Sequence, residues 1–160
     1  MLALRKVGMV LAAAALLAAP MFASAQLPDK KVLNLETAKK VAAAAEAESK
    51  KNNWAQTIAI VDDGGHLVYL ARIDETFTGS VRVAIEKAKS AVGFKRPTKE
   101  FSDALAAGRQ AVLGLHGAIP LEGGVPLMAG GKIIGAIGVS GGLTAQDEQV
   151  ARAGAAAMPK

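Results

Sequence analysis

Hydrophobic and polar positions follow two different periodicities along this chain, and each predicts one kind of element. Apolar residues that recur every three or four positions, as at Ala38, Val41 and Ala45, are typical of a helix with one buried face. Short β-branched runs bounded by glycine or asparagine, as in 57–61, are typical of strands. The pattern predicts helices over 35–50, 80–93, about 99–107 and 144–157, and strands over 57–61, 67–71, 125–129 and 132–140.

Local signals mark the ends of these elements. Asn34 is a suitable N-cap for the first helix, and Thr144 to Asp147 resembles a capping box at the start of the last. Asp-Asp-Gly-Gly at 62–65 is typical of a hairpin turn, as are Gly130 and Gly131, because glycine tolerates positive φ. The order α-β-β-α-α-β-β-α predicts an α+β fold, in which one antiparallel sheet is covered by helices.

The N-terminal segment has the pattern of a cleavable signal peptide. Arg5 and Lys6 precede an apolar run of about 13 residues, and Ala23-Ser24-Ala25 stands before Gln26. The run is shorter than the roughly 17–25 residues of a membrane-spanning helix. We therefore expect a signal peptide over 1–25 and one mature domain over 26–160. That domain would be periplasmic or secreted, and not embedded in the membrane after cleavage.

Composition narrows the function classes. The chain has no cysteine, so disulfides and thiolate metal sites are excluded. Removing the signal peptide, which carries two cations and no acid, lowers the formal charge from +5 to +3. The mature chain shows no dense basic stripe, so we expect no nucleic-acid partner. Abundant alanine and glycine favour close packing, including packing between copies of the chain.

Two motifs that resemble catalytic sites do not meet the requirements of those sites. Gly138-Val-Ser140-Gly-Gly142 matches G-x-S-x-G, but a nucleophile elbow needs a histidine further along the chain, and none follows His116. The two histidines, His66 and His116, are 50 positions apart, which does not predict a zinc site. The glycines more simply allow a tight turn between a strand and a helix.

Binding of an anion is an open alternative from the residues themselves. Arg72, Lys89 and Arg96 could meet carboxylates of a ligand, although an ordinary solvated surface is the commoner explanation of such residues. The backbone amides of Gly123 and Gly124 could hold an anion, although a plain turn is the commoner use of such a pair.

Several stretches in one order resemble the GlcG/HbpS-like family of small haem-binding proteins. The resemblance covers about residues 33–156, nearly the whole mature chain. It is carried by Val61–Leu67 in the first hairpin, by Lys87–Lys89 with Phe94–Thr98, by Ile119–Leu127, by Gly131–Gly142, and by Gln146–Glu148 with Ala151 and Gly154.

The resemblance implies a profilin-like α/β sandwich, with a five-stranded antiparallel sheet and helices on its faces. It also implies homo-oligomers, often octamers, and binding of haem, in some members with iron binding and slow haem degradation. Because the chain has no C-x-x-C-H, such a haem b would be bound non-covalently. We therefore predict an exported haem-binding protein that stores, carries or senses haem.

Candidate haem contacts follow from the resemblance and from haem chemistry. The family implies Thr98 as an iron ligand in one lineage and a histidine in another, for which His116 and His66 are chemically more natural. Cations for the propionates would be Arg96, Lys89 and Arg72, and Phe94 would stack on the porphyrin, with Phe101 and Trp54 as further aromatics.

Two other functions stay open. One is an enzyme or binding protein for a small anionic metabolite in the same pocket, where Glu122 would be a general base and the amides of Gly123 and Gly124 an anion site. The other is an oligomeric signalling or structural partner whose outer surface does the work.

Overall fold

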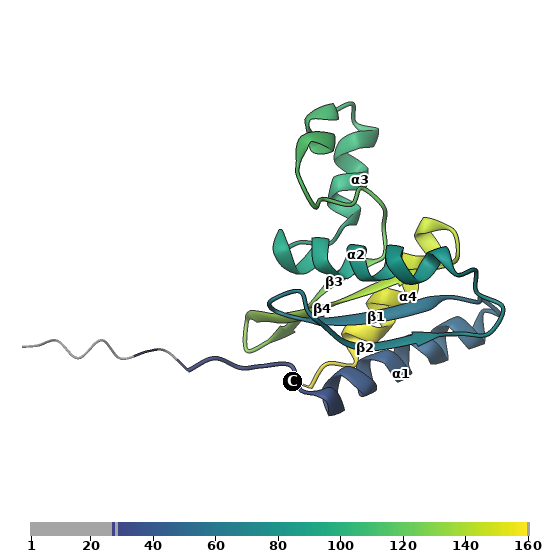
Figure 1. Cartoon of the computed structure of the whole chain (residues 1–160), viewed down its shortest axis with the longest axis vertical. Coiled ribbons are helices and arrows are strands. Elements are labelled where there is room, and N and C mark those ends of the chain that lie inside the picture. Colours follow the sequence, from purple (N-terminus) through teal and green to yellow (C-terminus); the bar gives the residue numbers. More distant parts are fainter. Residues whose placement is uncertain (1–26, 28, 160) are drawn as a thin grey trace, which may run out of the picture.

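A four-stranded antiparallel sheet separates two layers of helix in the computed structural model (Figure 1). The structure describes residues 27 and 29–159, and the predicted signal peptide and its cleavage site lie outside them. The strand order is β2-β1-β4-β3, so that β2 and β3 form the edges. The strands are β1 (Thr57–Asp62), β2 (Leu67–Arg72), β3 (Gly124–Ala129) and β4 (Lys132–Ser140).

The helices cover the two faces of the sheet unequally. One helix, α2, lies alone across β1, β4 and β3, whereas α1 and α4 pack against each other on the opposite face (Figure 1). A short helix, α3, and the 3₁₀ helix η1 project from the α2 side, and we call residues 99–121 the arm. The helices are α1 (Leu35–Lys51), α2 (Gly79–Gly93), α3 (Lys99–Ala106), η1 (Gln110–Gly114) and α4 (Thr144–Ala156).

The ends of the elements follow from local hydrogen bonds. The side chain of Asn34 accepts a hydrogen bond of 2.8 Å from the amide of Thr37 and so caps α1 as predicted. In the first hairpin, Oδ1 of Asp62 accepts from the amides of Gly64 and His66, each at 2.9 Å. These bonds close the turn between β1 and β2.

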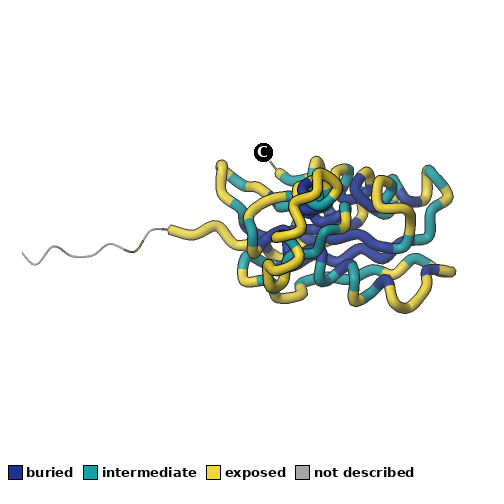
Figure 2. The backbone as a smooth tube through the Cα atoms, turned by 90° about the horizontal axis from the view of Figure 1, so that it is seen from above, coloured by how far each residue is buried: buried dark blue, intermediate teal, exposed yellow. Residues whose placement is uncertain are grey.

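The main hydrophobic core lies between the sheet and the α1–α4 layer. Strand β1 is buried on both faces, so its side chains alternate between two cores (Figure 2). A smaller cluster lies beneath α2. The main core contains Val41, Ala45, Ile58, Ile60, Leu127, Ile137, Val139 and Val150, and the smaller one contains Val61, Ala88, Ala91, Val92 and Ala136.

A row of very small residues lets α2 approach the sheet closely. Ala59, Gly138 and Gly124 are register partners across β1, β4 and β3. A Cβ atom added to Gly138 would lie 2.0 Å from the carbonyl oxygen of Ala84 and 2.6 Å from the amide nitrogen of Ala88. Since both are backbone atoms of α2, only glycine fits at this position.

The predicted α+β class and every predicted helix and strand are confirmed, with bounds that differ by about one residue. The five-stranded sheet is wrong for the described part of the chain, which has four strands. The segment that would have to supply a fifth strand, between α3 and β3, contains Gly108, Gly114, Gly117 and Pro120. Two of these glycines have positive φ, and the segment forms η1 and turns instead.

No helix among the described residues combines the length and the apolar character needed to cross a bilayer.

We expect Gly138→Ala to destabilise the fold by about 3 kcal/mol or more, because α2 must move away from the sheet to admit the methyl group. Gly93→Ala is the matched control. It lies in α2, the helix that Gly138 faces, and an added Cβ would meet nothing within 4 Å. Urea unfolding should show the Gly93 variant within about 0.5 kcal/mol of wild type or slightly more stable. Equal stability of the two variants would contradict the close approach.

Candidate functional site

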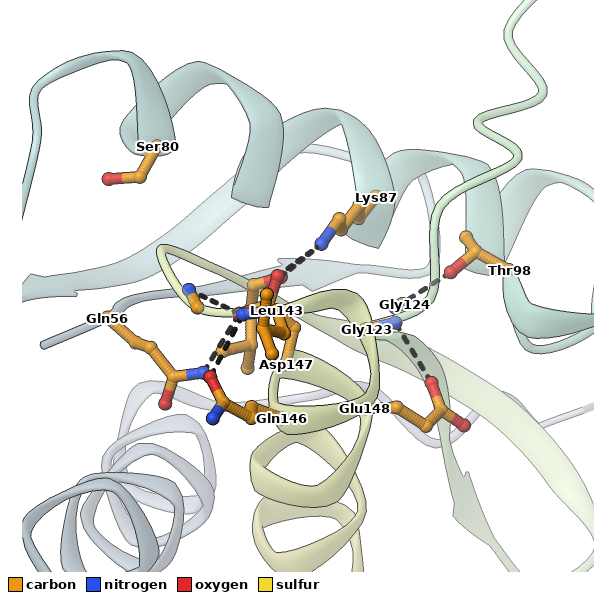
Figure 3. Close-up of polar contacts among 12 residues, drawn as sticks. Gln56, Ser80, Lys87, Thr98, Gly123, Gly124, Leu143, Gln146, Asp147 and Glu148 are labelled. Carbon is orange, nitrogen blue, oxygen red and sulfur yellow. Dashed lines mark hydrogen bonds and ion pairs between the residues drawn. The ribbon is translucent and has the colours of Figure 1, made fainter. Parts of the chain in front are cut away.

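A buried ion pair lies between α2 and the first turn of α4 (Figure 3). Nζ of Lys87 is 2.8 Å from Oδ2 of Asp147 and donates a second hydrogen bond, of 2.9 Å, to the carbonyl oxygen of Val139. The two side chains are only 2% and 3% exposed. A lysine so deeply buried requires such partners, because an unpaired buried charge is strongly unfavourable.

The other oxygen of Asp147 extends this cluster toward α1. Oδ1 accepts hydrogen bonds from Nε2 of Gln56 at 2.8 Å and from the amide of Gly142 at 3.0 Å. Gln56 in turn accepts from the hydroxyl of Ser49 at 2.7 Å. Buried polar bonds thus connect α1, β1, α4 and α2 at one end of the sheet, and both carboxylate oxygens of Asp147 are satisfied within the chain.

The start of α4 differs from the predicted capping box in a way that explains this cluster. Leu143, not Thr144, occupies the N-cap position, and Oε1 of Gln146 accepts from the Leu143 amide at 2.9 Å. Gln146 therefore has the capping role predicted for Asp147. The carboxylate of Asp147 is left to face the interior and Lys87 (Figure 3).

The glycine pair at the start of β3 is held by side chains from both sides of the sheet. The amide of Gly123 donates to Oε2 of Glu148, and the amide of Gly124 donates to Oγ1 of Thr98, each at 2.9 Å (Figure 3). The Thr98 amide donates back to the Gly124 carbonyl at 2.9 Å. A Cβ at Gly124 would lie 2.4 Å from the carbonyl oxygen of Lys87, so glycine is required there. Both amides are already bonded, and neither has a hydrogen left for an external anion.

An aromatic pair and a cation lie at the base of the arm. The rings of Phe94 and Phe101 meet edge to face, with centroids 5.2 Å apart. The guanidinium of Arg96 lies 5.7 Å from the centroid of the Phe101 ring, and one of its nitrogens is 3.7 Å from a carboxylate oxygen of Glu100. Phe94 and Arg96, both predicted site residues, are thus brought together here.

Glu122, the predicted general base, is tied to the arm. Its carboxylate is 3.2 Å from Nζ of Lys99, which also bonds Asp103 at 2.8 Å. The hydrogen bond with Asp103, followed by that with Glu122, raises the pKa of Lys99 above its ordinary value. Glu122 is therefore the partner of a permanently charged ammonium at neutral pH.

His116 lies in the most exposed part of the arm, between η1 and the return of the chain to α2. The return is marked by a hydrogen bond of 3.0 Å from the Ile119 amide to the hydroxyl of Ser90. His116 is exposed, and the leucines around it are exposed as well. These leucines are Leu113, Leu115 and Leu121, with exposed fractions of 65%, 44% and 42%.

The remaining predicted site residues lie elsewhere. His66 is at the β1–β2 turn, with an 83% exposed side chain whose Nδ1 is 3.3 Å from Oδ1 of Asp62. Arg72 is the last residue of β2, the strand that begins directly after His66. The six residue steps from His66 to Arg72 correspond to about 20 Å. Lys89 pairs with Glu86 at 3.1 Å on the outer side of α2. His66 and Arg72 are therefore too far apart to contact one small ligand together.

The sequence alone did not identify Lys87, Asp147 and Gln56 as members of a buried polar cluster. For Lys87 a signal was present, because it falls on the same helical stripe as Ala84 and Ala91, which are both fully buried. A lysine within a buried alanine stripe predicts an internal partner. Nothing local to Gln56 indicates that its side chain would meet a residue 91 positions away.

Among the described residues, no group of three or more histidine, aspartate or glutamate side chains is placed to hold a metal ion.

Comparisons with known proteins agree on one family. The pattern of the family described as "Haem degrading protein HbpS-like" matches residues 33–156. Protein GlcG of Escherichia coli K12 is 43% identical over 111 residues, which cover 69% of this chain and 83% of GlcG. The crystal structure of a double mutant of HbpS from Streptomyces reticuli has a TM-score of 0.76 at 35% identity, covering 90% of this chain and 99% of that one. A complex of PduOC with haem has a TM-score of 0.72 at 26% identity, covering 80% and 96%.

We expect Lys87→Met to destabilise the chain by about 3–5 kcal/mol, since it leaves the buried carboxylate of Asp147 without a cation. The double variant Lys87→Met/Asp147→Asn should recover a large part of that loss in urea unfolding. Asparagine carries no charge and can still accept from Gln56 and Gly142. A double variant no more stable than Lys87→Met alone would show that the buried charge is not the cause.

Stability in acid should depend on Asp62. The amide of His66 first, then the amide of Gly64 and the imidazole, lower the pKa of Asp62 below its ordinary value, while burial opposes them. A folded-state pKa below the unfolded one, about 3.9, gives stability that is complete above the unfolded value and lost as the pH falls through the folded value. Between about pH 5 and pH 3, wild type should lose more stability than Asp62→Asn in urea unfolding. Parallel losses would contradict this assignment.

Proposed function

The chain belongs to the family of HbpS-like haem-degrading proteins, and from this premise we propose that it is an exported haem-binding protein that stores, carries or senses haem. Two further comparisons support the proposal: the fold is that of HbpS, and a related fold has been crystallised with haem. The observation on this chain that carries it is the exposed imidazole of His116 among exposed leucines on the arm.

The residues of the arm fit what haem requires of a protein. Non-covalent haem needs an iron ligand, an apolar surface for the porphyrin, and cations for two propionates. His116 supplies an imidazole, Leu113 and Leu115 supply apolar surface, and Arg96 supplies a cation at the base of the arm. The half-buried Phe94 adds aromatic surface, and the buried Phe101 lies behind it and beneath Arg96.

Among the three candidate iron ligands, the surroundings favour His116. Thr98 is fully buried, and its hydroxyl already accepts the amide of Gly124. His66 stands beside the carboxylate of Asp62 at a hairpin turn. His116 makes no hydrogen bond or ion pair through its side chain within the described part of the chain. Bound haem would supply iron chemistry, and the chain would supply the ligand, the apolar wall and the orientation.

Assembly into a homo-oligomer belongs to the same proposal. Exposed leucines on a projecting segment are removed from contact with water only when something covers them. A second copy could cover the part of the arm that haem leaves open, and a subunit interface would enclose a porphyrin better than one arm can. Octamers, as the family resemblance implied, are one such assembly.

The competing activity on a small anionic metabolite receives no support from the geometry. It relied on free amides at Gly123 and Gly124 and on a free carboxylate at Glu122. Both amides are bonded to side chains of the chain, and Glu122 is paired with Lys99.

Titration of the purified chain with haemin tests the proposal. We expect a saturable Soret band for wild type, and at least tenfold weaker binding or a shifted band for His116→Ala. His66→Ala is the matched control, because it removes another exposed imidazole outside the arm, and its spectrum should equal that of wild type. Absence of a saturable band at micromolar haemin would overturn haem binding for this protein.

The same titration separates a structural from a ligating role of Thr98. Thr98→Val should leave the Gly124 amide without an acceptor and reduce stability by about 1–3 kcal/mol. The Soret band at saturation should stay where it is in wild type. A shifted band in Thr98→Val, with His116→Ala unchanged, would make threonine the ligand instead.

A further inference from the structure

We propose that a lysine-rimmed hollow at one end of the sheet binds the carboxylate of a ligand that also has an apolar body. The hollow has a volume of about 580 Å³. It lies where residues 29–31 pass the β3–β4 hairpin, at the end of the sheet that carries both hairpin turns (Figure 1). Its size falls within the range of ligand pockets, roughly 300–1,000 Å³.

Cations from three separate segments of the chain converge on this hollow. Lys30 and Lys31 come from the N-terminal segment, Lys95 from the turn after α2, and Lys132 from the start of β4. Among the described residues that line the hollow, only Asp29 is acidic. Residues so far apart in sequence are brought together only by the fold.

Three of these lysines have no counter-ion within the described part of the chain. Lys30 pairs with Asp63 across the first hairpin turn. Lys31, Lys95 and Lys132 form no ion pair with any described residue, and the Lys31 ammonium lies against the tip of the second hairpin, 3.2 Å from where a Cβ of Gly130 would be. Like charges gathered around one hollow repel each other, and an anion placed among them removes that repulsion.

The floor of the hollow is apolar and lies at a bulge in β4. Leu127 pairs with Gly135 and Met128 with Ile133, so Ile134 is an extra residue on β4. Ile134 packs into the main core and Ile133 against the cluster beneath α2, and both line the hollow, together with Met128. Bulges are often found beside binding sites.

Charge and floor together define the class of ligand. Lysine ammonium groups donate to carboxylates, while the isoleucines and the half-exposed Met128 favour contact with hydrocarbon. A small inorganic anion would leave the apolar floor unused. Carboxylates on an apolar body occur in fatty acids and in the propionate edge of haem, and for haem the inference rests on the function proposed above.

The experiment titrates the purified chain with two probes, dansyl-labelled undecanoate followed by fluorescence and haemin followed by absorbance. The test variants are Lys95→Gln/Lys132→Gln, which removes two rim charges, and Met128→Asp, which places an acid on the floor. The matched control, Lys39→Gln/Lys51→Gln, removes two exposed charges from α1. We expect both test variants to weaken at least one probe tenfold or more, and the control to equal wild type.

The pattern of losses distinguishes the ligand sources and the two proposals. Weakened undecanoate binding assigns the hollow to a fatty acid, and weakened haemin binding assigns it to the haem propionates. If haemin saturates equally in every variant and undecanoate does not bind, the hollow is not the site, whereas haem binding stands. If only undecanoate binds, with loss in both test variants, haem binding fails and the inference stands. Equal losses in the α1 control would attribute the effect to net charge and overturn the inference.

Discussion

The close contact between α2 and the sheet is the constraint on which the rest of the molecule depends. Because Gly138 and Gly124 present no side chain, the helix backbone rests almost directly on β4 and β3. At that distance the side chain of Lys87 cannot reach water, so its ammonium must find partners inside. The Val139 carbonyl and Asp147 provide them. The two glycines and the buried ion pair are therefore two parts of one arrangement.

This arrangement also fixes where the arm begins. Gly124 lies beneath α2, and its amide and carbonyl both bond Thr98, the residue at which α3 starts. On the other side, the Gly123 amide reaches Glu148 of α4. The base of the arm is thus tied to both helical layers, while His116 and the leucines near it are held away from the sheet. A rigid base under an exposed apolar segment is a suitable geometry for capturing a ligand or a second subunit.

The sequence predicted what local periodicity and turn chemistry determine. Asn34 capped the first helix as expected, and the glycines at 64–65 and 130–131 lie in the hairpin turns. The sequence could not predict contacts between residues that are far apart along the chain. Gln56 meets Asp147, 91 positions away, only through the fold. The fifth strand came from resemblance alone, and the glycines between α3 and β3 explain its absence from the described residues.

The edge strand β3 has a consequence for how copies of this chain can meet. β3 contains Pro126, which has no N–H to donate, and its ladder with β4 shifts register directly afterwards. An outer edge with a missing donor and a broken register is a poor template for another strand. Pairing between strands of two copies is therefore disfavoured along β3, and copies that meet on that side would do so through side-chain surfaces.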